Sequence, residues 1–375
     1  MRVLICGGGV IGAATAYFLA KRGVDVTVVE RTGIACAASG KSGGFLGLDW
    51  CDGGPLEGLA RRSYALHAAL AGELDADYGY RAMTTYSGFA AANRKSSINN
   101  DFGVGWISDE LALASQLGTV ETTAQVEPGA FTRALVTAAE RRAAGVIQGT
   151  VADLARSDDG GTVTGATVTE GDSSRLIEAD AVVLAMGPWS ILATKWVPLP
   201  AVFGLKGHSL VFDTPEGLPP DALFIEYREA SGATASPEVF PRSNGTTYVC
   251  GVSAHDSPLP VDPADVTPDP GSIERLEAIC AALSPALDPT RIIARQSCFR
   301  PVTQDGLPLI GAIPGVGNAY VATGHSVWGI LNAPATGEAM AELIVDGAAT
   351  TVDLSAFDPG RSPPFDASRL QTGTL

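Results

Sequence analysis

A glycine-rich segment near the start of the chain has the spacing of a turn that binds phosphate. Gly7, Gly9 and Gly12 fit the pattern GxGxxG, with Val10 and Ile11 between the last two glycines. The first glycine permits a tight turn, the second lets the backbone approach a pyrophosphate, and the third lets a helix pack closely on a strand. A helix that begins here presents free N–H groups and the positive end of its dipole to phosphate oxygens.

The residues around this turn predict the elements that position it. Residues 2–6 form an apolar run typical of a buried parallel strand, residues 13–22 have the periodicity of a helix, and residues 24–30 form a second strand. Glu30 ends this strand 18 residues after the last motif glycine, where an acid accepts hydrogen bonds from ribose hydroxyls. Arg31, the next residue, is also a predicted cofactor contact. This order predicts a dinucleotide-binding βαβ unit, and the glycines alone do not distinguish FAD from NAD.

Later segments supply candidate contacts for the second half of a dinucleotide. Residues 37–44 (AASGKSGG) are rich in small residues, and residues 178–186 (EADAVVLAM) form a predicted strand that ends before a glycine. Between them, a predicted helix over residues 128–144 leads into a predicted strand over residues 146–154. The predicted cofactor contacts in these segments are Ser39, Gly40, Lys41, Ser42, Gly43, Gly44, Val151, Gly187 and Trp189.

Two blocks near the C-terminus carry further candidates. Residues 298–311 (CFRPVTQDGLPLIG) contain Cys298 and Arg300 and a predicted Asp-Gly turn. A predicted strand over residues 319–323 precedes a loop, and a helix is predicted to begin at Pro334, because proline suits the first helical turn. The positive end of this helix would stabilise negative charge beside the loop. The loop residues predicted to contact the cofactor are Gly324, His325, Ser326, Val327, Trp328, Gly329 and Ile330.

The composition limits the classes of function. A net charge of −16 argues against nucleic acids and anionic membranes as partners, because both are bound by basic patches. The chain has no apolar run of about 18 residues, and its glycine motif begins at residue 7. We therefore expect a cytoplasmic protein with no membrane span and no signal peptide. Six cysteines without a CxxC pair, and only four histidines, predict no metal site.

In this order, the blocks resemble the D-amino-acid oxidase superfamily, with glycine oxidases and sarcosine oxidases as similar members. The matching segments are GGGVIG, ASGKSGG, ADAVVLAMGPWS, FRPVTQDGLPLIG and GHSVWGILNAPATG, spread from residue 3 to about residue 345. The resemblance implies FAD as the cofactor. It also implies an α/β fold with a discontinuous Rossmann-type FAD-binding domain and an α+β substrate domain on a mostly antiparallel sheet.

The resemblance further implies how the chain divides between the two domains. Residues 1–80, 124–200 and 296–350 would form the FAD-binding domain, and residues 81–123 and 201–295 the substrate domain. The remaining residues, 351–375, would form a loosely packed C-terminal tail.

Arg300 is the first candidate for substrate contact. In relatives an arginine at this position clamps the substrate carboxylate, which a guanidinium binds bidentately; a structural ion pair is the alternative. The backbone of the loop 324–330 meets the pyrimidine edge of the flavin in relatives. His325 is a candidate contact of substrate or flavin, or else a packed residue. Val327 stands where glycine oxidase has an arginine, which argues against glycine as the substrate.

Four further residues are candidates, and two of them have an alternative interpretation. Glu238 stands where glycine oxidase has a tyrosine that contacts substrate, and an acid there favours an amine-bearing substrate unless it is a solvated loop residue. Cys298 matches in spacing the cysteine that holds covalent flavin in monomeric sarcosine oxidase, or else it is a small packed side chain. Lys206 and Lys41 are candidates for a cation near the flavin that promotes reaction with oxygen.

The function implied by the resemblance is oxidation of an amino acid or secondary amine. A hydride would pass from the carbon next to nitrogen to flavin N5, giving an imine, and electrons would then pass to molecular oxygen to give hydrogen peroxide. One alternative is a dehydrogenase of an amino or hydroxy acid that passes electrons to a quinone or a carrier protein. Another is a non-catalytic flavoprotein that serves as an assembly factor.

Overall fold

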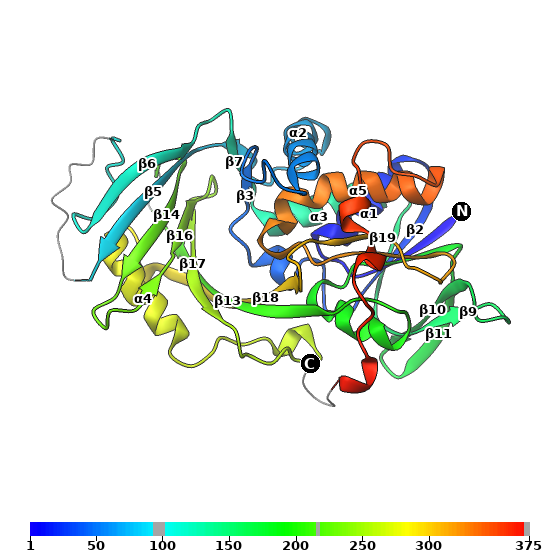
Figure 1. The fold of residues 1–375 in the computed structure, drawn as a ribbon. Coiled ribbons are helices and arrows are strands. Elements are labelled where there is room, and N and C mark those ends of the chain that lie inside the picture. Colours follow the sequence, from blue (N-terminus) through cyan, green and yellow to red (C-terminus); the bar gives the residue numbers. More distant parts are fainter. Residues whose placement is uncertain (93–101, 215–217, 371–375) are drawn as a thin grey trace.

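The N-terminal strand lies inside a six-stranded sheet with the order β19-β20-β12-β1-β2-β8 (Figure 1). The structure is a computed structural model that describes residues 1–92, 102–214 and 218–370. Parallel strands buried on both faces are made of near-continuous apolar runs, as β1 is. The parallel strands are β1 (Arg2–Cys6), β2 (Asp25–Glu30), β8 (Gly145–Gln148), β12 (Ala181–Leu184) and β20 (Ala319–Thr323), and the antiparallel β19 (Leu309–Ala312) ends the sheet.

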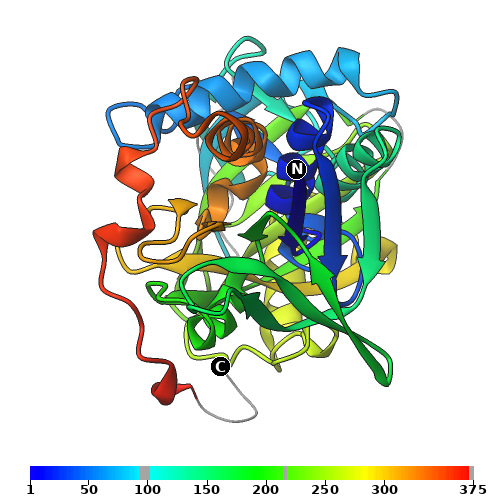
Figure 2. The ribbon, with the colours of Figure 1, turned by 90° about the vertical axis from the view of Figure 1, so that its right-hand side faces the viewer.

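Helices cover one face of this sheet, and a three-stranded sheet covers the other (Figure 2). Val3 and Ile5 of β1 pack among the helices, whereas Leu4 and Cys6 pack against the small sheet. Because side chains of a strand alternate between its faces, this two-sided cover buries all four residues. The helices are α1 (Val10–Lys21), α3 (Pro128–Glu140) and α5 (Gly329–Asp346), with α2 (Glu57–Glu73) packed on α5, and the small sheet contains β9 (Thr150–Arg156), β10 (Val163–Glu170) and β11 (Ser173–Glu178).

An eight-stranded sheet stands beside the first (Figure 1). Its order is β18-β13-β17-β16-β14-β5-β6, with β15 paired to β14, and neighbours are antiparallel except for β14 and β5. Helix α4 (Ser272–Leu283) packs its apolar residues on this sheet. The predicted fold class is confirmed. The strands are β5 (Thr84–Ala91), β6 (Leu111–Gly118), β13 (Val202–Asp213), β14 (Asp221–Arg228), β15 (Thr234–Ala235), β16 (Glu238–Pro241), β17 (Thr246–Ala254) and β18 (Ile292–Thr303).

A second three-stranded sheet lies between the two large sheets (Figure 1), and one long strand crosses the predicted boundary between the domains. This sheet contains β3 (Phe45–Gly47), β4 (Arg81–Ala82) and β7 (Thr123–Gln125). Strand β18 crosses the predicted domain boundary between residues 295 and 296 without interruption. The predicted division of the chain into two domains remains a prediction.

Two predicted strands are wrong in their extent. The strand predicted over residues 178–186 begins at Ala181, because Glu178 already ends β11 in the three-stranded sheet. The strand predicted over residues 146–154 is interrupted at Gly149 and continues as two strands, β8 and β9, in different sheets. An apolar run does not reveal a change of sheet, because both sheets bury the strand.

The predicted start of the last helix is also wrong. Helix α5 begins at Gly329, so Pro334 lies inside the helix and not in its first turn. Two of the other predicted bounds shift by a few residues: α1 begins at Val10, and α3 ends at Glu140. The early start of α5 places its first turn, and not a preceding loop, at residues 329 and 330.

The segment after residue 350 packs on the body of the protein, so the prediction of a loosely packed tail is wrong as far as residue 370. Phe357 is fully buried within the helical layer. The Nε atom of Arg361 lies 2.7 Å from Oδ2 of Asp305, which anchors this segment beside the predicted turn. Residues 371–375 of the predicted tail lie outside the described residues.

Candidate active site

A cavity of about 900 Å³ runs between the six-stranded sheet and the eight-stranded sheet. At one end it is lined by Gly9 and Glu30, and at the other by Glu238 and Arg300. Its volume lies in the upper part of the range of about 300–1,000 Å³ that is usual for ligand sites. The cavity therefore connects the predicted nucleotide site with the predicted substrate site.

The glycine turn at the start of α1 is shaped to admit a phosphate group. Gly7 has a φ of +116°, and a Cβ at Gly12 would lie 2.0 Å from the carbonyl oxygen of Gly7, so larger residues do not fit either position. Gly9, Val10 and Ile11 line the cavity where α1 begins. The positive end of the helix therefore opens on the cavity, which fits the pyrophosphate of FAD.

Glu30 stands at the end of β2, as the sequence predicts for a residue that binds a ribose. Its carboxylate accepts hydrogen bonds from the N–H groups of Gly8 (2.7 Å) and Thr32 (2.9 Å). Its Oε1 also accepts from the Gly33 N–H (3.4 Å) and the Cys36 thiol (3.9 Å). Among the described residues, Oε2 accepts from Gly8 alone, so it keeps a lone pair at the cavity wall for a hydroxyl donor. The residues at this end fit FAD.

The segment that contains Lys41 crosses from the nucleotide end to strand β18. The Lys41 ammonium lies 3.3 Å from the carbonyl oxygen of Ser297, and Lys41 lines the cavity. The Tyr248 hydroxyl donates to the Lys41 carbonyl at 3.1 Å, and Arg242 donates to the Ser42 carbonyl at 2.9 Å. Two residues that the sequence analysis missed therefore hold this segment in place.

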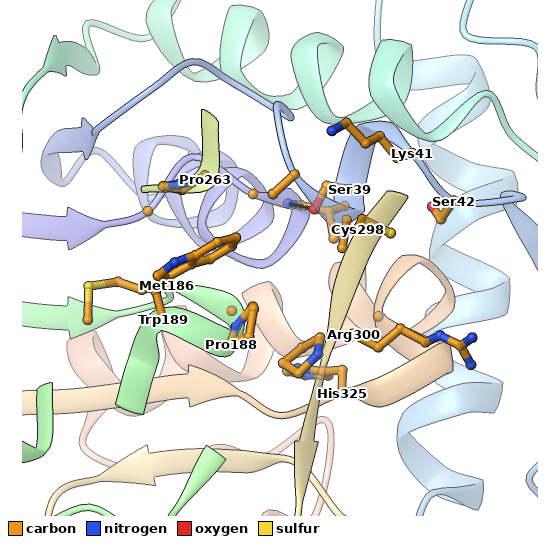
Figure 3. A pocket seen from close by; sticks show the side chains of 18 of the residues that line it. Ser39, Lys41, Ser42, Met186, Pro188, Trp189, Pro263, Cys298, Arg300 and His325 are labelled. Carbon is orange, nitrogen blue, oxygen red and sulfur yellow. Dashed lines mark hydrogen bonds between the residues drawn. The ribbon is translucent and has the colours of Figure 1, made fainter. Parts of the chain in front are cut away.

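Arg300 and Cys298 lie on the same face of β18 and line the cavity together (Figure 3). The Nη2 atom of Arg300 donates to the Ser253 hydroxyl on β17 at 2.8 Å, across the intervening strand β13. Burial raises the pKa of the Cys298 thiol, although the positive charges of Arg300 and Lys41 oppose this shift. Cys298 is therefore a thiol and not a thiolate at neutral pH.

Glu238, at the start of β16, brings a carboxyl group to the same part of the cavity. Burial raises the pKa of its carboxyl group, and the nearby Arg300 guanidinium opposes this shift. The Cys250 thiol donates to the carboxylate at 3.5 Å. Arg300 and Glu238 therefore place a guanidinium and a carboxyl group in one region of the cavity.

His325 is buried beside the first turn of α5 and lines the cavity. Its Nε2 atom lies 3.1 Å from the Thr336 hydroxyl oxygen on α5. Burial lowers the pKa of His325 to about 3, so the imidazole is neutral at physiological pH. It can contact a ligand or orient the loop, but it does not contribute a positive charge.

The cavity brings together most of the predicted site residues. Lys206 is the main correction: it lies on the opposite face of the sheet from Arg300, and its ammonium pairs with Asp269 at 2.5 Å. The other five predicted residues that do not line the cavity are Gly12, Gly40, Gly44, Gly324 and Trp328. Those that line it are Gly7, Gly9, Val10, Ile11, Glu30, Arg31, Ser39, Lys41, Ser42, Gly43, Val151, Gly187, Trp189, Glu238, Cys298, Arg300, His325, Ser326, Val327, Gly329 and Ile330.

Strand β17 contributes cavity residues that the sequence analysis missed. Tyr248 and Cys250 line the cavity by strand alternation, and Ser253 joins them because the pairing of β17 with β13 shifts by one residue near Gly251. The alternation of Tyr248 and Cys250 in the sequence of β17 is a signal that could have indicated these two residues. The irregularity that turns Ser253 to the same face has no comparable signal.

Comparison with known families decides the cofactor. The model of the family described as "DAO: FAD dependent oxidoreductase" matches residues 2–343. The chain belongs to this DAO family. FAD is therefore its cofactor, and the protein is an FAD-dependent oxidoreductase.

Among the residues that the structure describes, no group of three or more His, Cys, Asp or Glu side chains is placed to hold a metal ion. In that same part of the chain, no helix combines the length and the apolar character needed to cross a membrane.

Individual relatives match this chain over nearly their whole length. A Schizosaccharomyces pombe protein named as an oxidoreductase is 32% identical, over 95% of this chain and 97% of its own. Glycine oxidase from Geobacillus kaustophilus is 29% identical over 95% of each chain. A crystal structure of glycine oxidase from Geobacillus kaustophilus has a TM-score of 0.78 at 26% identity, over 96% of this chain and 99% of the other. L-Proline dehydrogenase from P. horikoshii, with a TM-score of 0.76 at 20% identity, shares the fold.

Proposed function

We propose that this DAO-family protein oxidises a small amino acid at the carbon next to nitrogen, with molecular oxygen as the electron acceptor. The observation that carries the proposal is that the Arg300 guanidinium and the Glu238 carboxyl group lie together at one end of the FAD cavity, where the charge of Arg300 favours ionised Glu238. A zwitterionic substrate offers a carboxylate to one and an ammonium to the other. The similarity to glycine oxidases supports amine oxidation as the reaction class.

In this proposal Arg300 fixes the orientation of the substrate. Its guanidinium is held at Ser253 and presents further N–H donors to a carboxylate, which it binds bidentately. Glu238 receives the substrate nitrogen. FAD supplies the hydride acceptor when bound. The role of the protein is then positioning, which requires no strong base among the cavity residues.

One feature limits which amino acids are expected as substrates, and another concerns the reaction with oxygen. Val327 lines the cavity and is 55% exposed, so an apolar side chain and not a second arginine faces the ligand space. We expect an amino acid with an apolar side chain to react better than glycine. Lys41, at the cavity wall next to β18, is the remaining candidate for the cation that promotes reaction with oxygen. We also propose a cytoplasmic location.

The decisive experiment mixes holoprotein with a panel of amino acids, secondary amines and hydroxy acids, and follows flavin bleaching and peroxide. Reduction by an amino acid with one peroxide per turnover supports an oxidase. Reduction without peroxide identifies a dehydrogenase, and no reduction by any compound contradicts the proposed function.

A matched pair of variants separates the role of Arg300 from general effects of charge on β18. Arg300→Met should lower kcat/KM about 10- to 100-fold, the loss expected for one charge-assisted contact. Arg295→Met removes an arginine on the same strand that pairs with Glu277 at the surface, and it should retain activity. Equal activity of the two variants contradicts the role of Arg300.

A further inference from the structure

Helix α5 begins at the cavity and contains a proline that interrupts its hydrogen bonding. Gly329 and Ile330 of its first turn line the cavity. Pro334 has no N–H to donate to the carbonyl of Ile330, four residues earlier. A buried carbonyl without a partner is destabilising. The first turn of α5 therefore needs a donor from outside the helix.

Helix α2 supplies that donor. The Nε2 atom of His67 lies 2.9 Å from the carbonyl oxygen of Ile330 and 3.2 Å from that of Leu331. Because carbonyls only accept, Nε2 carries a hydrogen. Burial lowers the pKa of His67 to about 4, so the ring is neutral and Nδ1 is the unprotonated nitrogen. The N–H of Ala335, which would otherwise pair with Leu331, donates to the Ser63 hydroxyl at 2.9 Å.

The contacts of α2 continue past the proline. Arg62 donates from Nε and Nη2 to the two carboxylate oxygens of Glu338 at 2.8 and 2.7 Å. Ser63 and His67 are four residues apart on one face of α2, and both are fully buried. The two helices run antiparallel here, so these three side chains hold α5 before, at and after Pro334.

We propose that His67 is a positioning residue for the flavin site. Through the carbonyls of Ile330 and Leu331 it fixes the first turn of α5, whose positive end faces the cavity. FAD with its pyrophosphate at the start of α1 would extend along the cavity toward Gly329 and Ile330, where a fixed positive helix end would stabilise negative charge on the flavin ring. This inference depends on the FAD site and not on the identity of the substrate.

Sulfite binding to the holoprotein tests the proposal, because sulfite adds to a flavin and leaves negative charge on the ring. His67→Leu removes the donor, whereas His67→Gln retains an N–H of similar reach. We expect the Leu variant to bind FAD but to bind sulfite about five- to tenfold more weakly, with a more negative midpoint potential, as the loss of a helix-terminus interaction predicts. The Gln variant should stay within about twofold of the wild type.

A matched control removes a buried hydrogen bond elsewhere. Ser284→Ala eliminates the bond from a buried hydroxyl to the Trp106 carbonyl beside α4, and it should leave sulfite affinity unchanged. The proposal is overturned if His67→Leu has the sulfite affinity and midpoint potential of the wild type. It is also overturned if Ser284→Ala weakens sulfite binding as much as His67→Leu does, or if His67→Gln binds sulfite as weakly as His67→Leu. If His67→Leu does not fold, Ser63→Ala is measured, and unchanged sulfite binding there overturns it.

The substrate panel distinguishes this inference from the proposed function. Absence of amine oxidation together with the expected sulfite pattern rejects the proposed substrate and retains the role of His67. Amine oxidation with unchanged sulfite binding rejects only the role of His67.

Discussion

Gly207 of β13 lies directly beneath the guanidinium of Arg300, and a Cβ at this position would come within 3.0 Å of Arg300 Nη2. The Arg300 side chain crosses β13 at this point to reach Ser253 on β17. A side chain at position 207 would occupy the path of the guanidinium. The absence of a side chain at Gly207 thus allows the two residues on either side of β13 to bond.

Substitution of this glycine should weaken substrate binding without loss of the cofactor. In Gly207→Val we expect kcat/KM for an amino acid to fall about tenfold, mainly through KM, because the displaced guanidinium no longer meets the carboxylate. Ser253→Ala removes the anchor without added bulk and should show a smaller effect in the same direction. An unchanged KM in Gly207→Val, with FAD content equal to the wild type, would contradict this arrangement.

Glu238 should make stability depend on pH in a specific direction. Burial raises the pKa of this carboxyl group above its unfolded value of about 4.3. The unfolded chain therefore releases this proton first, so the free energy of unfolding falls as pH rises from about 4.3 through the raised pKa. Glu238→Gln should remove this contribution, measured as a smaller decrease in the unfolding free energy across that window.

The same variant should lose activity toward zwitterionic substrates. Without the carboxylate, the substrate ammonium has no counter-charge, and we expect kcat/KM to fall about tenfold or more. Cys250→Ala, which removes the thiol that donates to Glu238, is the milder comparison. Retained activity and an unaltered pH profile of stability in Glu238→Gln would show that this acid neither titrates in this window nor binds substrate.

His67 should make the holoprotein less stable at acid pH. Burial lowers its pKa to about 4, compared with about 6.5 in an unfolded chain. Its contribution to stability is therefore complete above about pH 6.5 and is lost as pH falls toward 4, which amounts to about 2 kcal/mol at pH 5. Denaturant unfolding at pH 5 and pH 8 should show a smaller difference for His67→Gln than for the wild type. Equal differences would mean that His67 is not held neutral by burial.

The flavin should be released by acid precipitation. Burial raises the pKa of the Cys298 thiol, and the thiolate is the nucleophile that a thioether bond to flavin requires. We expect a yellow supernatant, with Cys298→Ala giving the same result. A yellow pellet that becomes colourless in Cys298→Ala would show covalent attachment and would favour secondary amines as substrates.

The sequence by itself determined the nucleotide site and the family. In the first 30 residues the strand, turn, helix and acid follow one another within a few residues, so their relation in space follows from local geometry. Gly7, Gly12 and Glu30 stand where the motif predicts them. The motif around Arg300 likewise indicated Cys298 and Arg300 as candidates before their neighbours in space were known, and both line the cavity.

Only the tertiary structure decided which residues meet across sheets and helices. Lys206 on β13 and Arg300 on the paired strand β18 are near neighbours in the sheet, but strand alternation turns their side chains to opposite faces. The sequence does not say which of the two faces borders the cavity. His67 has no motif, because its role depends on the approach of α2 to α5 more than 260 residues later in the chain. Pro334 resembled a helix start for the same reason: the donors that let it lie inside α5 belong to a distant segment.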